Sequence, residues 1–150
     1  MYAASASSGN LILCGNSISG SIPTTIGSLT KLETVLLYDN SITGTIPTEI
    51  GTMTNLEVFD VHSNGLSGTI PTEIGMATNL LSLTISTNEP GLTGTIPTEM
   101  LLLTNLVRFS GFANYDQNNT NPKVIEKYQT GEWNRYLNSS HMASKIYACC

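Results

Sequence analysis

Residues 32–55 read LETVLLYDNSITGTIPTEIGTMTN, and residues 56–79 repeat the pattern as LEVFDVHSNGLSGTIPTEIGMATN. The asparagine of each copy recurs every 24 residues, at Asn16, Asn40, Asn64 and Asn88. The tripeptide Ile-Pro-Thr recurs at residues 22–24, 46–48, 70–72 and 96–98. A fixed period in this range is typical of stacked repeats, in which each unit contacts only its neighbours. The sequence therefore predicts a solenoid with an extended binding surface.

Aligned on the asparagine, each unit reads L-x-x-L-x-L-x-x-N-x-L-x-G-x-I-P-x-x-I-G-x-L. This pattern resembles the plant-type leucine-rich repeat of receptor-like proteins and polygalacturonase inhibitors, and it covers about residues 10–114. The motif GTIPTEIG is also similar to motifs in repeats of algae, diatoms in particular. The resemblance implies an α/β solenoid, a right-handed superhelix with a parallel concave β-sheet of about four to five short strands.

The alternation of apolar residues in each unit supports the same fold independently. Leu-x-Leu spacing predicts a short strand with one buried face, and stacked coils place equivalent side chains in columns. We expect the asparagine ladder, defined as Asn16, Asn40, Asn64 and Asn88, to point inward. Each amide would bond the backbone of its own turn and of the next coil, because a buried amide without partners costs about 1–3 kcal/mol.

The repeats divide the chain into three parts. Residues 1–9 form a lead-in, residues 10–114 form the repeat array, and residues 115–150 form a tail without the period. Asn121-Pro122 followed by apolar residues and closed by Gly131 predicts a short capped helix in that tail. The tail is interpreted either as a cap over the last coil or as a linker.

Composition excludes several classes of protein. The net charge is −5, and the repeats hold only Lys31 and Arg108 as basic residues, which argues against a nucleic-acid partner. No apolar run reaches the roughly 18 residues of a membrane span, and the first residues do not form a signal peptide. The resemblance nevertheless implies an extracellular or cell-surface location, possible only if this is one segment of a longer protein. Asn118 and Asn138 stand in Asn-x-Ser/Thr sequons and are candidate glycosylation sites.

Outward strand positions are expected to lie free of the core, on the concave face. A mixed apolar and polar patch across two adjacent coils suits recognition of a peptide or glycan, although an ordinary solvated sheet is the alternative. The candidate ligand-binding residues are Leu36, Tyr38, Asp60, His62, Thr84, Ser86, Arg108 and Phe112. The fourth unit has two added residues, so Glu89, Pro90 and Gly91 are expected to project as a rim loop, unless the added length is neutral drift.

Catalysis is not expected, although Asp60, His62 and Ser86 lie close enough in the pattern to suggest a triad. An open curved sheet excludes no water, and the chain has no phosphate-binding loop or nucleophile elbow. The column of Glu49, Glu73 and Glu99 is interpreted as hydrated rather than metal-binding. No metal site and no cofactor are predicted.

The sequence thus predicts a non-catalytic recognition module for a protein, peptide or glycan, belonging to a larger receptor-like or secreted protein. The alternatives are a spacer that stacks end to end through its Leu11 and Leu13 edge, or an ice-binding surface. The latter would use paired hydroxyl columns that flank the repeated glycine. These pairs are Ser19/Ser21, Thr43/Thr45, Ser67/Thr69 and Thr93/Thr95.

Overall fold

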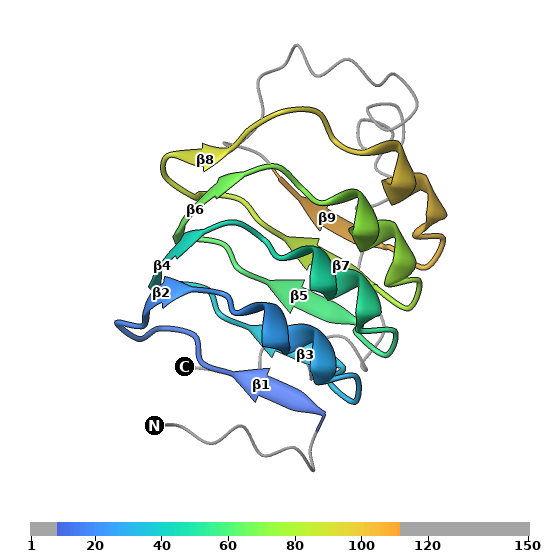
Figure 1. Ribbon diagram of the computed structural model, residues 1–150, viewed down its shortest axis with the longest axis horizontal. Helices are drawn as coiled ribbons and strands as arrows, with labels where there is room; N and C mark the ends of the chain where they lie inside the picture. Colours follow the sequence, from blue (N-terminus) through green and yellow to red (C-terminus); the bar gives the residue numbers. More distant parts are fainter. Residues whose placement is uncertain (1–8, 112–150) are drawn as a thin grey trace.

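The computed structural model describes residues 9–111, which wind into stacked coils (Figure 1). One parallel sheet takes a short strand from every coil, in the order β1-β3-β5-β7-β9. The strands are β1 (Asn10–Ile12), β3 (Thr34–Leu36), β5 (Val58–Asp60), β7 (Ser82–Thr84) and β9 (Arg108–Ser110). Equivalent residues pair across them, as Leu36 does with Asp60 and Asp60 with Thr84. The predicted solenoid with one parallel strand per repeat is confirmed.

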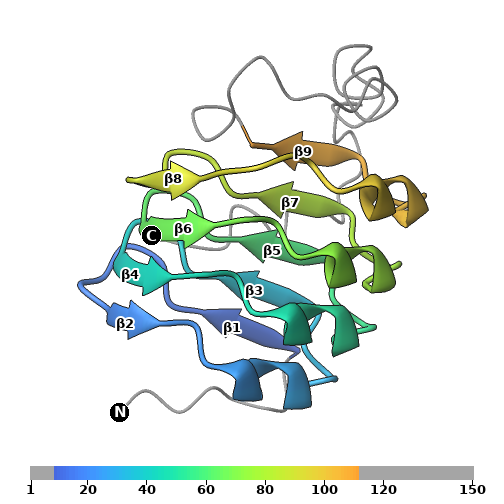
Figure 2. The same ribbon diagram turned by 45° about the horizontal axis from the view of Figure 1, so that its top comes forward.

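A second parallel sheet runs along another side of the coils (Figure 2). Its strands are β2 (Ser19–Ser21), β4 (Ser41–Gly44), β6 (Gly65–Gly68) and β8 (Gly91–Leu92). Apolar alternation did not predict this sheet, because its strands consist mainly of Ser, Thr and Gly with one buried apolar residue each at Ile42, Leu66 and Leu92.

The side of the coils opposite the first sheet carries short 3₁₀ helices rather than α-helices. They are η1 (Thr24–Ser28), η2 (Thr48–Thr52), η3 (Thr72–Met76) and η4 (Thr98–Leu102). Each follows the proline of an Ile-Pro-Thr motif, which is extended. In η2, the Ile50 amide donates to the Pro47 carbonyl at 3.2 Å. Five residues are too few for a stable α-helix, and the tighter 3₁₀ turn is typical of such short pieces.

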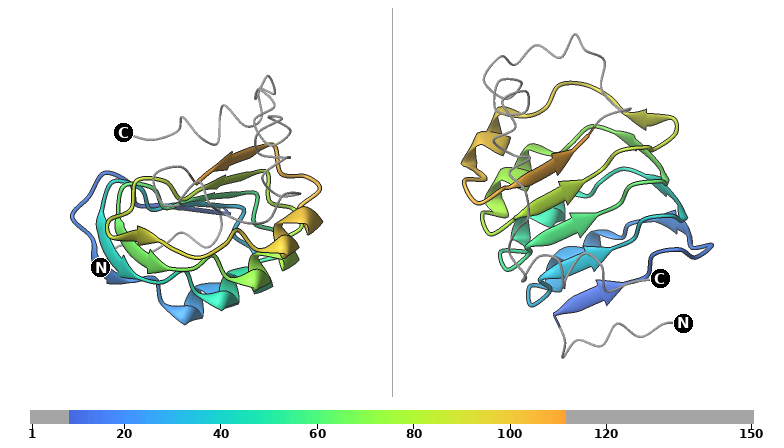
Figure 3. Two further views of the ribbon diagram at one scale, coloured as in Figure 1. Left: turned by 90° about the horizontal axis from the view of Figure 1, so that it is seen from above. Right: turned by 180° about the vertical axis from the view of Figure 1, so that it is seen from behind.

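Viewed along the stack, the two sheets and the 3₁₀ helices enclose one interior (Figure 3). Side chains at equivalent positions form columns there. The column from the first sheet consists of Val35, Phe59, Leu83 and Phe109, each at most 2% exposed. Burying a side chain of this size contributes about 1.5–3 kcal/mol, so the apolar columns hold the coils together.

Neighbouring coils approach closely at the 3₁₀ helices. A Cβ on Gly51 would lie 2.3 Å from the carbonyl oxygen of Glu73 in the next coil, and Gly27 and Gly75 are in the same situation. Only glycine fits where two backbones come this near. In the fourth coil, Leu101 takes this position.

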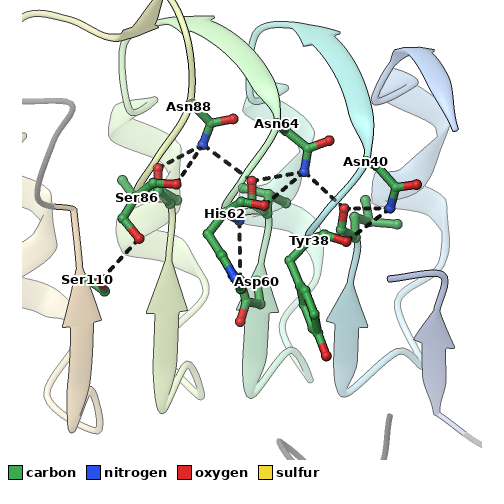
Figure 4. Close-up of polar contacts among 11 residues, drawn as sticks. Tyr38, Asn40, Asp60, His62, Asn64, Ser86, Asn88 and Ser110 are labelled. Atoms are coloured by element: carbon green, nitrogen blue, oxygen red, sulfur yellow. Dashed lines mark hydrogen bonds and ion pairs between the residues drawn. The ribbon is translucent and has the colours of Figure 1, made fainter. Parts of the chain in front are cut away.

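The asparagine ladder links each coil to the preceding one (Figure 4). The Asn64 amide nitrogen donates to carbonyls of its own coil and, at 3.0 Å, to Leu37 of the coil before. Its oxygen accepts from the Ile42 amide at 2.9 Å. Asn40 and Asn88 repeat this arrangement. The expectation of bonds to the next coil was therefore wrong in direction: the asparagine follows its strand, so its side chain reaches back.

The first asparagine differs from the rest of the ladder. Asn16 is exposed, and its amide nitrogen donates only to carbonyls of its own coil, those of Leu13 and Cys14. Within residues 9–111 no coil stands before it to extend the ladder. In the same described part of the chain, no helix has the length and apolar character to cross a membrane.

Candidate functional site

The outward face of the β1-β3-β5-β7-β9 sheet holds the predicted concave site. Val35 and Phe59 point into the core, so their neighbours Leu36 and Asp60 point the other way. Leu36 and Val58 form a separate apolar cluster, with partly buried Ile12, Tyr38, Leu81 and Val107 against it. Leu81 and Val107 were not predicted, because they precede their strands and lie outside the alternating pattern.

Three concave residues are buried, contrary to the expectation that they lie free. Leu36 is 1% exposed, Thr84 is 3% exposed and Asp60 is 6% exposed. Leu36 and Thr84 flank Asp60 in register on both sides. The alternation of apolar residues along a strand predicts to which face a side chain points, but the exposure of that side chain depends on the size of its neighbours. These residues therefore form the floor of the face rather than its exposed surface.

Asp60 and His62 form a hydrogen-bonded pair that joins this floor to the surface. The Asp60 Oδ1 atom lies 2.6 Å from the His62 Nδ1 atom and also accepts from the His62 backbone amide at 3.3 Å. The His62 side chain is 29% exposed, against 9% for that of Asp60. The bond to Asp60 raises the pKa of His62 above its ordinary value, although burial acts in the opposite direction.

Tyr38 covers one face of the histidine ring. The two ring centroids are 4.7 Å apart and the rings are inclined by 13°, a stacked arrangement. Tyr38 follows β3 and His62 follows β5, so the pair bridges two adjacent coils (Figure 4). Both side chains are partly exposed. The structure therefore brings together Leu36, Tyr38, Asp60 and His62 as the sequence predicted.

The remaining candidates lie farther along the sheet. Ser86 follows β7, and its hydroxyl accepts a hydrogen bond from Ser110 of β9 at 3.3 Å (Figure 4). Arg108 begins β9 and is partly exposed. Within the described residues no hydrogen bond joins the His62 ring to the Ser86 hydroxyl, which instead pairs with Ser110, so the triad geometry is not assembled there. Phe112 lies outside the described residues.

The predicted rim loop is only partly a loop. Glu89 and Pro90 are exposed, but Gly91 is buried and begins β8, where it pairs with Ser67. The pairing offset between β6 and β8 is 24 residues, against 22 between β4 and β6. The two added residues are therefore absorbed before Gly91, because the buried Leu92 must keep its register in the second sheet.

The hydroxyl columns run along the second sheet and are largely exposed. One of them is hydrogen-bonded to the preceding coil: Thr43, Ser67 and Thr93 donate to the carbonyls of Gly20, Gly44 and Gly68 at 3.2–3.3 Å. This column contributes to stacking, and an ice-binding role for it stays a prediction. Among residues 9–111, no group of His, Cys, Asp or Glu has the arrangement of a metal site. Asn118, Asn138 and the predicted cap lie outside the described residues.

The family model for the Leucine Rich Repeat matches residues 10–29, 31–53 and 55–76. Each match contains one coil of the stack. These coils are plant-type leucine-rich repeats. No curated protein matches its sequence.

Solved structures of plant leucine-rich repeat ectodomains are similar to this leucine-rich repeat protein. The plant peptide hormone receptor RGFR1 in complex with RGF2 is 46% identical, with a TM-score of 0.67 over 71% of this chain and 16% of that chain. The Arabidopsis receptor kinase HAESA, in complex with the peptide hormone IDA and the co-receptor SERK1, is 32% identical, with a TM-score of 0.66 over 73% of this chain and 19% of the other.

The ectodomain of the receptor kinase SOBIR1 from Arabidopsis thaliana is 31% identical, with a TM-score of 0.64 over 70% of this chain and 55% of that chain. This leucine-rich repeat protein thus spans roughly half or less of the structures it resembles. The similarity covers about the length of the described coils.

Proposed function

We propose that this leucine-rich repeat protein is a non-catalytic module that binds a peptide on its concave sheet, at a site centred on Tyr38 and His62. The observation that carries the proposal is their stacked pair, which is partly exposed and anchored by Asp60. Aromatic side chains with fixed geometry are typical anchors of protein and peptide interfaces, because they offer a large contact area at little entropic cost.

The similar structures favour a peptide over the other ligand classes. Two of them are complexes with peptide hormones, RGF2 and IDA. An extended peptide also suits the shape of a parallel sheet that crosses several coils. The same similarity favours an extracellular or cell-surface location and a larger parent protein. Under this proposal residues 10–114 form the recognition array, and Asn118 and Asn138 carry glycans.

Selection of peptides from a random displayed library on the full chain tests the proposal. We expect enriched peptides to bind at least about tenfold more weakly to the double variant Tyr38→Ala/His62→Ala. Thr25→Ala is the matched control, since Thr25 is exposed on η1, away from the sheet. If the enriched peptides bind the double variant as tightly as they bind the Thr25→Ala control, the site at Tyr38 and His62 is excluded. Binding of an arrayed glycan in place of any peptide would change the ligand class.

A second candidate function is end-to-end stacking through the edge of the first coil. A hollow of about 370 Å³ opens there and is lined largely by apolar side chains, including Leu11, Leu13, Ile18 and Ile22. The exposed Asn16 lies on the same coil, and among residues 9–111 its amide nitrogen donates only to the carbonyls of Leu13 and Cys14. A second copy that placed a coil against this edge would bury the hollow.

Sedimentation at several protein concentrations tests stacking. If copies stack, the mean mass rises with concentration, and Leu13→Asp, which places a charge in the hollow, abolishes the rise. A single monomeric species at every concentration argues against end-to-end stacking. This result leaves the peptide proposal intact.

A further inference from the structure

Asp60 has an acceptor atom that the fold does not use. Both hydrogen bonds that Asp60 accepts end on Oδ1, from the His62 ring and the His62 amide. Within residues 9–111, no hydrogen bond ends on Oδ2, and this atom is not among the fully enclosed polar atoms that lack a partner, so it remains accessible from the face. A carboxylate buried to this extent is poorly hydrated, so an additional donor that reached Oδ2 would form a strong, charge-assisted bond.

Thr84 places a second unused polar atom beside this carboxylate. It is the register partner of Asp60 on the adjacent strand and points to the same face. Its Oγ1 atom is buried and has no hydrogen-bond partner among the described residues. Buried side-chain hydroxyls are paired in the large majority of cases. Thr34 Oγ1 is also buried and unpaired, but of these two threonines only Thr84 has a carboxylate, that of Asp60, as its register partner, so an unpaired acceptor and a carboxylate stand side by side there.

The charge around the site selects the kind of group. The described residues contain eight carboxylates and only two basic side chains, Lys31 and Arg108. Asp39 is near enough to favour a positive charge on His62, and Arg108 opposes it more weakly. Glu33 and Glu57 immediately precede β3 and β5. The field at this end of the face therefore attracts a cation and repels an anion.

We propose that Asp60 Oδ2 and Thr84 Oγ1 together receive the cationic end of a lysine or arginine side chain of the ligand. Both atoms accept from its N–H groups, and the exposed ring pair of Tyr38 and His62 packs along its aliphatic stem. The inference rests on the proposed peptide function and gives its ligand a chemical class, a peptide with a basic residue at the centre of the contact.

Protonation of His62 competes with such a ligand. When the imidazole is charged, it neutralises the Asp60 carboxylate; when it is neutral, the carboxylate remains uncompensated and the incoming cation gains the full attraction. The groups that face the ring are Asp60, Asp39, Arg108 and Tyr38. Because the pKa of His62 is raised, affinity for a basic ligand should increase as the pH rises through and above the ordinary range of histidine.

The test uses the full chain, labelled with ¹⁵N, and two small probes that differ in charge alone. N-acetyl-arginine amide is titrated in one series, and its uncharged isostere N-acetyl-citrulline amide in the other. We expect the arginine probe to shift the amide signals of Asp60, His62 and Thr84. Its dissociation constant should be at least about tenfold lower than that of the citrulline probe. Equal shifts with both probes would overturn the inference.

Two conservative variants locate the interaction. Asp60→Asn removes the charge with little change in shape, and Thr84→Val removes the orphan hydroxyl. Each variant should bind the arginine probe more weakly, and Asp60→Asn should raise the dissociation constant by about tenfold or more. The dispersion of the remaining amide signals should not change, which shows that the variant is folded. If Asp60→Asn does not fold, the affinity of Thr84→Val for the arginine probe and the pH dependence of the wild-type affinity test the inference instead. Unaltered binding to the folded variants would reject the assignment.

The outcomes separate this inference from the proposed function. If selected peptides depend on Tyr38 and His62 but contain no excess of Lys or Arg and tolerate Asp60→Asn, the basic-ligand inference fails and peptide recognition stands. If no peptide is selected although the arginine probe binds at Asp60, the cation site stands and the peptide function fails.

Discussion

The ring of Tyr38 lies flat on the imidazole of His62, although the two residues belong to different coils. Their centroids are 4.7 Å apart, and the Asp60 Oδ1 atom lies 2.6 Å from the Nδ1 atom at the edge of the imidazole. The histidine is therefore fixed by two contacts on different strands. A side chain held in this way loses little freedom on binding, which favours its use as an anchor.

The pair predicts a titration behaviour. A histidine whose folded pKa lies above the unfolded value of about 6.5 stabilises the fold below that pH, and the stabilisation is lost as the pH rises through the folded pKa. We expect Asp60→Asn to lower the pKa of His62, because the dominant hydrogen bond becomes uncharged. NMR titration of the His62 ring measures this. A pKa unaffected by Asp60→Asn would contradict the geometry.

Replacing Tyr38 tests the stacking. Tyr38→Phe keeps the aromatic face and should keep the stack, whereas Tyr38→Ala removes it and should lower the free energy of unfolding by about 0.5–1.5 kcal/mol. The ring-current shift of the His62 Hε1 proton should survive in the first variant and vanish in the second. A shift retained in Tyr38→Ala would rule out the stacked pair.

The asparagine ladder predicts a strong dependence on position. Asn64→Ala leaves the buried Ile42 amide without an acceptor and removes three donor contacts, at roughly 1–3 kcal/mol for each group left unpaired. Asn16→Ala is the matched control, and we expect it to cost less than about 1 kcal/mol, because Asn16 is exposed and bonds only its own coil. Urea unfolding measures the loss of unfolding free energy in both variants. Similar losses for Asn64→Ala and Asn16→Ala would contradict the predicted dependence on position.

The close approach of the coils predicts the effect of one added methyl group. Gly51→Ala places a Cβ at 2.3 Å from the Glu73 carbonyl oxygen, so the backbone must shift, and we expect a loss of about 1–3 kcal/mol or more. Thr25→Ala on the exposed surface of η1 should change stability by no more than about 0.5 kcal/mol. Thermal unfolding distinguishes the two, and a neutral Gly51→Ala would mean that the coils lie farther apart.

The period determined most of the architecture in advance, because one repeated constraint acts on every coil. The strands around Val35 and Phe59 and the inward columns follow directly from it. The burial of Asp60 did not follow, since it depends on the bulk of Leu36 and Thr84 on either side. Gly91 was misplaced for a similar reason: the register of Leu92 in the second sheet is a contact between coils, which no pattern within one coil encodes.

The sequence predicted that Leu36, Tyr38, Asp60 and His62 are neighbours, but it predicted neither their contacts nor the presence of Leu81 and Val107. Spacing placed Tyr38 beside His62 and Asp60 on the same face, yet the stack and the half-used carboxylate depend on side-chain torsions. The orphan hydroxyl of Thr84 gave no signal in the sequence, because threonine is an ordinary residue at a strand position.

The backward reach of Asn40, Asn64 and Asn88 makes the solenoid polar along its length. Each coil needs its successor to satisfy a backbone amide, as Ile18 needs Asn40. Losing a coil from the leading end exposes an asparagine that water can solvate, as Asn16 shows, whereas losing one from the trailing end orphans a peptide group beside the core. The two ends of a shortened array therefore differ in chemistry: a side-chain amide loses partners when the leading coil is removed, and a backbone N–H loses its acceptor when the trailing coil is removed.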